Sequence, residues 1–147
     1  MIKRYGIKQL SIFLENRKGR LLEVTEALKD ASINIRALAL AESAEFGILR
    51  LVVNNPEKAK SVLASHGFTV MEQEVLAVEV VDEPGGFYHV VKLLTDNDIN
   101  VDYTYAFVGG ETRAILLFKV SSESLEKAMS VLSNGGVTLM EPMFFYD

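Results

Sequence analysis

Near the start of the chain, the spacing of the hydrophobic residues changes from one regular pattern to another. Leu10, Ile12 and Leu14 alternate with their neighbours, which is the two-residue period of a half-buried strand. Between residues 21 and 31 the apolar residues recur at the three- and four-residue spacing of an amphipathic helix. The pattern therefore predicts a strand that leads directly into a helix.

The pattern continues with four more elements before the middle of the chain. They are strands at residues 34–41 and 48–53, a helix at 56–66 and a closing strand at 68–74. Pro56 occupies a position that favours the start of a helix, and Gly67 follows the last apolar residue of that helix. The order of elements is βαββαβ.

The second half of the chain repeats the first. A shift of 66 residues places Gly19 on Gly85 and Asn34 on Asn100, and the few extra residues needed later fall between elements, where loops tolerate them. The second copy predicts elements at 75–81, 87–97, 100–108, 113–120, 124–133 and 137–143. We expect two domains, residues 1–74 and 75–147.

The order βαββαβ predicts the fold class of each domain. It is a split βαβ unit, which forms an antiparallel four-stranded sheet with both helices on one face. We therefore expect an α+β protein with two tandem ferredoxin-like domains.

Composition narrows the function classes. Hydrophobic residues make up 49% of the chain and charged residues 24%, which predicts a packed globular protein. The net charge of -5 argues against nucleic acid or an anionic membrane as a partner. The absence of cysteine excludes thiolate chemistry. No apolar run approaches the roughly 18 residues of a membrane span, so a cytoplasmic location is expected.

Two turns carry a resemblance to a known family. The segment from Asn16 to Leu21, followed by Asn34, and the segment from Asp82 to Phe87, followed by Asn100, resemble the turn and second strand of the ACT domain family. The chain is also similar to small bacterial and archaeal proteins that consist of two ACT domains. The resemblance implies regulatory domains that pair side by side and bind amino acids or related metabolites where they pair.

The resemblance also implies which residues bind the effector. In the first copy they are Asn16, Arg17, Lys18, Gly19, Arg20, Leu21, Asn34 and Ile35. In the second copy they are Asp82, Pro84, Gly85, Gly86, Phe87, Asn100 and Val101. Lys18 departs from the family pattern, which usually has proline there.

The first turn has chemistry that suits an α-amino acid. Backbone N–H groups at a helix start attract a carboxylate, and Gly19 allows it to approach closely. Arg17, Lys18 and Arg20 add positive potential, and the carboxamides of Asn16 and Asn34 both donate and accept hydrogen bonds. The glycines are explained equally well by a structural role, because glycine adopts backbone angles that other residues avoid. Asn34 is explained equally well as a cap of the turn before its strand.

The second turn differs in charge and in its neighbouring strand. Asp82 and Glu83 stand where the first copy has Asn16 and Arg17, so this turn should repel a carboxylate or prefer a cation. The alternating residues of the second strand also differ: Ala37, Ala39 and Ala41 align with Tyr103, Tyr105 and Phe107. Either the two pockets differ in volume, or the aromatic rings fill space between packed elements.

Catalysis, cofactors and metals are not expected. The chain has two histidines and no recognisable catalytic motif, and the function predicted is a non-catalytic sensor, with an enzyme regulated in trans as a possible partner. The alternative is an assembly module that binds no metabolite. The residues expected on an apolar sheet face away from the helices are Phe13, Leu38, Leu40, Ala77, Val81 and Leu117. Such a face predicts a homodimer.

Overall fold

A computed structural model describes residues 5–108 and 113–146 of the chain. These residues form two compact units. We call Lys8–Gln73 with Phe145–Asp147 the first domain, and Glu74–Phe144 with Met1–Ile7 the second domain. None of the helices in the described residues is long and apolar enough to cross a membrane.

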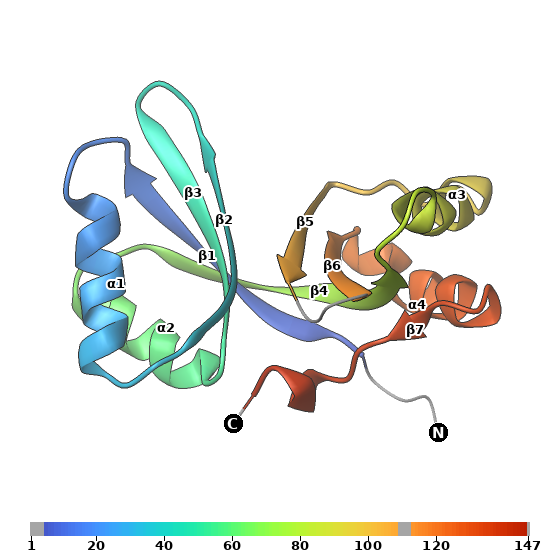
Figure 1. The fold of residues 1–147 in the computed structure, drawn as a ribbon. Coiled ribbons are helices and arrows are strands. Elements are labelled where there is room, and N and C mark those ends of the chain that lie inside the picture. The colour runs from blue at the N-terminus through green and yellow to red at the C-terminus, as the bar shows by residue number, and fades with distance from the viewer. Residues whose placement is uncertain (1–4, 109–112, 147) are drawn as a thin grey trace. The chain divides into compact units, whose positions relative to one another are not determined.

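The first domain is an antiparallel sheet with two helices (Figure 1). Its elements are β1 (Ile7–Glu15), α1 (Arg20–Asp30), β2 (Ile35–Glu42), β3 (Phe46–Val53), α2 (Pro56–Ser65) and the beginning of β4 (Val70–Val81). The strands lie in the order β2-β3-β1-β4, and α1 and α2 both lie on one face of the sheet. This face is where the alternating apolar residues of β1 point.

The core of the first domain lies between that face and the helices. Leu10 and Ile12 of β1 are fully buried and pack in one cluster with Val24 and Leu28 of α1 and Leu63 of α2. The strand period and the helix period seen in the sequence thus meet in one apolar layer.

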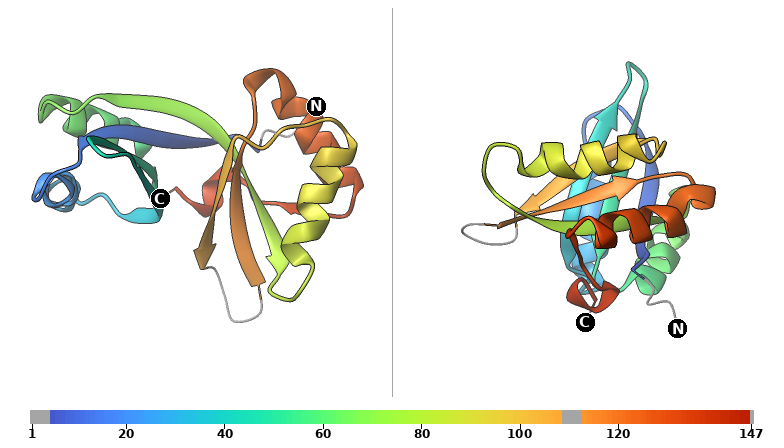
Figure 2. Two further views of the ribbon diagram at one scale, coloured as in Figure 1. Left: turned by 90° about the horizontal axis from the view of Figure 1, so that it is seen from above. Right: turned by 90° about the vertical axis from the view of Figure 1, so that its right-hand side faces the viewer.

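The second domain repeats this arrangement. It contains the end of β4, α3 (Gly86–Asp96), β5 (Tyr103–Val108), β6 (Arg113–Lys119), α4 (Leu125–Asn134) and β7 (Thr138–Leu139), with short 3₁₀ turns at η1 (Ser122–Ser124) and η2 (Pro142–Phe144). The strands are antiparallel in the order β7-β4-β6-β5. Figure 2 shows α3 and α4 next to each other on one face of these strands.

The predicted α+β class and antiparallel sheets are confirmed, with differences at element ends. The strands predicted at 68–74 and 75–81 are one continuous 12-residue strand, β4. The strand predicted at 137–143 has only the two residues of β7. Pro142 begins a 3₁₀ turn there, because proline has no N–H for the ladder and a fixed φ.

Two of the residues assigned to the outer sheet face lie on the helix side instead. Leu38 pairs with Leu51 and Leu40 with Leu49, and both partners belong to the core. The register of β2 shifts just after Ile35, and a one-residue shift moves every later side chain to the other face. The sequence pattern could not show this bulge.

The outer face is also less exposed than predicted. Ala77 and Leu117 are fully buried, whereas Phe13 and Val81 are 46% and 42% exposed. The continuous apolar surface expected from the sequence is therefore reduced to scattered residues.

The first prediction concerns the core of the first domain. Leu63→Ala should lower the free energy of unfolding by about 2–5 kcal/mol, because it leaves a cavity at a fully buried site. The matched control is Leu22→Ala on α1, where the leucine is 66% exposed and the change should stay within about 0.5 kcal/mol. Urea denaturation followed by circular dichroism measures both. Equal effects would contradict the packing described here.

Candidate functional site

Each domain has a tight turn between its first strand and its first helix. Gly19 precedes α1 with φ of 98°, and Gly85 precedes α3 with φ of 89°, both in the left-handed region that glycine adopts without strain. Neither helix has a side-chain cap at its N-terminus. The first helical bonds run from Glu23 N–H to Gly19 and from His89 N–H to Gly85, so the preceding N–H groups have no partner within the helix.

Asn16 holds the first turn against the neighbouring hairpin. Its Nδ2 donates to the carbonyl oxygens of Ser43 at 3.1 Å and Ala44 at 3.5 Å, and its backbone N–H donates to Glu45 at 2.8 Å. These three contacts join the end of β1 to the β2–β3 turn. The amide nitrogen of Asn16 therefore has a structural role.

The arginines of the first turn are paired with carboxylates. Arg17 Nε lies 3.0 Å from Glu15 Oε2, while Arg20 forms ion pairs with Glu23 and, at 3.8 Å, with Glu15. The Arg20 guanidinium also lies 4.5 Å from the centre of the Phe68 ring. Both arginines thus add less positive potential than the sequence predicted, whereas Lys18 forms no ion pair with the described residues.

Asn34 is fixed at the far end of the same sheet. Its backbone N–H donates to Asn54 Oδ1 at 2.8 Å, and its carbonyl accepts from Asn54 N–H at 3.1 Å. Ile35, the next residue, packs against the core. The main chain at the start of β2 is therefore tied to the end of β3.

Asn16 and Asn34 lie at opposite ends of β3, since Asn16 contacts Glu45 before this strand and Asn34 contacts Asn54 after it. The eight residues of β3 span about 26 Å. The expected site that joins the two carboxamides is not formed within the first domain. The reason is that α1 carries the chain along the sheet between them.

The second domain separates its predicted residues in the same way. Asn100 Nδ2 donates to Asp102 Oδ1 at 3.1 Å, and Asp102 N–H donates to Lys119 at the end of β6. Val101 packs against the core. The turn before α3 lies instead beside Val81, whose strand partner Arg113 begins β6.

Gly86 has a steric role in the second turn. A Cβ at this position would collide with the carbonyl oxygen of Val81, so the close approach of the chain requires glycine. The equivalent residue of the first domain is Arg20, which begins α1. The two turns therefore share the left-handed glycine but not the contacts that follow it.

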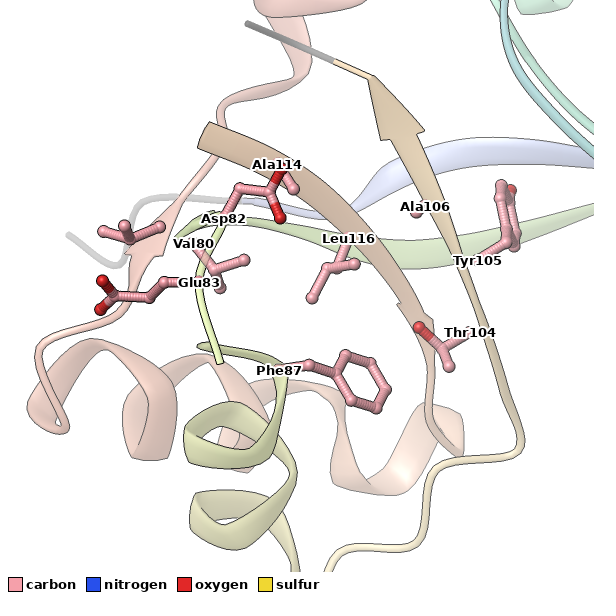
Figure 3. A pocket seen from close by; sticks show the side chains of 10 residues that line it. Val80, Asp82, Glu83, Phe87, Thr104, Tyr105, Ala106, Ala114 and Leu116 are labelled. Carbon is pink, nitrogen blue, oxygen red and sulfur yellow. The ribbon is translucent and has the colours of Figure 1, made fainter. Parts of the chain in front are cut away.

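A pocket of about 460 Å³ opens at the second turn (Figure 3). It is lined by Val80, Val81, Asp82, Glu83, Phe87, Thr104, Tyr105, Ala106, Ala114 and Leu116. Of the predicted residues, only Asp82 and Phe87 belong to it. Among the strand residues of its wall, the sequence pointed to Tyr105 as a pocket residue and missed Val80, Thr104, Ala106, Ala114 and Leu116.

A second, more open hollow of about 430 Å³ lies in the first domain. Its lining residues are Thr25, Leu28, Lys29, Ser32, Ile33, Asn34 and Ile35. It contains the predicted residues Asn34 and Ile35 but none from the turn before α1. The residues predicted at the first turn and those predicted at the start of β2 therefore do not share one pocket within the first domain.

A profile of the family described as the ACT domain pair matches residues 5–141. The chain belongs to this family. The ACT pair is 36% identical to protein BT0572 from Bacteroides thetaiotaomicron, with a TM-score of 0.91 and 97% of each chain covered. No curated protein is significantly similar to it in sequence.

The ACT pair also shares its fold with solved regulatory subunits. The ligand-free regulatory subunit of aspartate kinase from Thermus thermophilus matches with a TM-score of 0.65 at 14% identity, covering 87% of this chain and 91% of that one. The corresponding subunit from Thermus flavus matches with a TM-score of 0.60 at 14% identity, covering 88% and 92%. At this identity the likeness concerns the fold.

The histidines of the ACT pair contact backbone carbonyls. His66 Nδ1 lies 2.8 Å from the oxygen of Val62, and His89 Nε2 lies 3.2 Å from that of Gly135. Within residues 5–108 and 113–146, no three His, Asp or Glu side chains gather in a way that could hold a metal ion.

The second prediction tests the role of Asn16. Asn16→Ala should lower the free energy of unfolding by about 0.5–1.5 kcal/mol, because the hydrogen bonds to the β2–β3 turn are lost. Lys18→Ala is the matched control in the same turn, with no expected change beyond about 0.5 kcal/mol. Denaturation gives the energies, and faster amide exchange at residues 43–46 in the Asn16 variant would locate the effect. Unchanged exchange there would show that Asn16 does not hold the hairpin.

Proposed function

We propose that this ACT pair is a non-catalytic regulatory protein that binds an amino acid or a related small metabolite at an interface between ACT domains. The observation that carries the proposal is the repeated left-handed glycine turn in front of a helix without a side-chain cap. The first N–H group of each helix donates to a carbonyl of the turn, from Arg20 to Arg17 and from Gly86 to Glu83. The next two N–H groups and the positive end of the helix dipole can attract a carboxylate.

The other helix of the first domain provides a contrast. At the start of α2, the Asn55 side chain accepts a hydrogen bond from Lys58 N–H at 3.2 Å. A capped helix start of this kind has one donor fewer to offer a ligand. Of the two helix starts without a side-chain cap, the start of α1 is the better candidate for an anionic group, because Asp82 and Glu83 precede α3.

The separation of the predicted residues supports binding between domains. A small molecule cannot span the length of β3, so it cannot contact both Asn16 and Asn34 of one domain. If the turn of one domain met the second strand of another, both groups would reach the same ligand. We therefore propose that the chain forms a homodimer in which ferredoxin-like domains meet. The sequence repeat predicts these domains at residues 1–74 and 75–147.

The regulatory role rests on the family. The fold is shared with the regulatory subunits of aspartate kinase from Thermus thermophilus and Thermus flavus. We propose that this chain acts in the same general way, by contacting an enzyme in trans when its effector is bound.

A second candidate function is assembly without a metabolite. Leu38 and Leu40 lie on the same face of β2 and are 56% and 48% exposed. Exposed apolar side chains of this size on an edge strand favour a protein partner. This function would leave the free helix starts without a ligand.

The third prediction tests the proposal by a ligand screen. The purified chain is examined by thermal shift against the twenty amino acids, and positives are confirmed by calorimetry. A ligand at 100 times its dissociation constant should stabilise the chain by about 2.7 kcal/mol. If no compound gives a saturable shift in a folded protein, assembly becomes the better explanation.

Lys18 offers a matched pair of variants for the same screen. Lys18→Glu places a negative charge beside the helix start and should weaken binding of a carboxylate ligand about five- to tenfold, without loss of stability. Lys18→Gln, which removes the charge only, should have a smaller effect. Equal affinity in all three proteins would show that the first turn does not bind the carboxylate.

A further inference from the structure

The second domain has a pocket where the first domain has two leucines. In the first domain Leu38 pairs with Leu51, and Leu40 with Leu49. At the same register of the second domain, Thr104 pairs with Phe118, and Ala106 with Leu116. Smaller side chains on β5 therefore leave space beside the core strands of the second domain.

The pocket lies on the helix-facing side of the sheet, beside the first turn of α3. Leu116 belongs to the core cluster and forms the floor, while Val80 and Ala114 face the same space. The Phe87 ring points toward the pocket and stacks on Phe118, with ring centres 6.0 Å apart and planes inclined by 15°. An aromatic wall on an apolar floor suits a hydrophobic group.

The hydroxyl of Thr104 is already used. Its Oγ1 donates to the carbonyl oxygen of Leu117 at 2.7 Å. The strand side of the pocket therefore has little left to offer a polar ligand. The remaining polar side chains of the lining are Tyr105 and the carboxylates of the turn.

The carboxylate of Asp82 gives the pocket a negative mouth. In Figure 3 the Asp82 carboxylate lies beside Ala114 at the end of the pocket, whereas Glu83 points away from it. The nearby Arg113 forms an ion pair with Glu79 at 3.1 Å, and both residues are on the other face of the sheet. No Lys, Arg or His is among the described lining residues.

We propose that this pocket binds a small organic amine with an apolar or aromatic body. The ammonium group pairs with Asp82, and the body lies between Phe87 and the strand residues Ala106 and Leu116. The volume of about 460 Å³ is within the usual range for a small-molecule site. The pocket includes Asp82 and Phe87 of the second turn but lies within one domain, so it is separate from the effector site proposed at the first turn, which needs two domains.

The fourth prediction uses 2-phenylethylamine as the probe. Titration of the ¹⁵N-labelled chain should give saturable shifts at Asp82, Phe87 and Ala106, with a dissociation constant of about 1 mM or lower. The anion 3-phenylpropanoate has a similar shape and should bind at least about tenfold more weakly, because Asp82 repels it. Absence of saturable shifts with the amine, or equal binding of the anion, would overturn the proposal.

Two pairs of variants locate the site. Asp82→Asn should weaken amine binding about tenfold, while the control Glu83→Gln should change it less than about twofold. The double variant Thr104→Leu with Ala106→Leu introduces the leucines that the first domain has at this register. The larger side chains should fill the pocket and abolish the amine-induced shifts. Amine binding that survives in the leucine variant, or that is equally sensitive to both carboxylates, would place the amine elsewhere.

The test also separates this site from the effector site. Lys18→Glu changes only the first turn and should leave amine binding unchanged. An amine response without any amino-acid response would support the pocket and reject the interdomain effector site, and the reverse pattern would reject the pocket.

Discussion

In each domain one helix carries the chain along the length of the sheet, and the position of every candidate binding group depends on it. The 11 residues of α1 rise about 16 Å, and its buried residues Val24 and Leu28 pack on β1. This packing fixes the glycine turn at one end of the sheet and Asn34 at the other. A binding site must therefore use one end of a domain or combine ends from two domains.

The fold could be predicted from the sequence because burial controls its periodicity. The alternation of Leu10, Ile12 and Leu14 reports a strand whose inner face is almost fully buried, and the repeat supplies each element twice. The prediction failed where local backbone geometry decides the outcome. The bulge after Ile35 reverses the faces of β2, and no residue pattern marks it.

The candidate site was harder to predict, since residue type does not reveal which groups are already engaged. Asn16 has the chemistry to bind an amino acid, yet its amide nitrogen is used by the hairpin. Arg17 and Arg20 have positive charge, yet carboxylates of the same turn pair with them. The ion pair of Arg17 is exposed and therefore weak, so a ligand could displace it at a modest cost, whereas the Arg20 side chain is only 18% exposed.

The two domains show how one backbone supports different surface chemistry. Leu38 and Leu40 lie on edge strand β2 and are about half exposed, so leucine there contributes less hydrophobic stabilisation than at a buried site. Thr104 and Ala106 occupy the same register without disturbing the core cluster around Leu116. Edge positions of this sheet can therefore change the volume of a pocket, while the core that positions the turn stays intact.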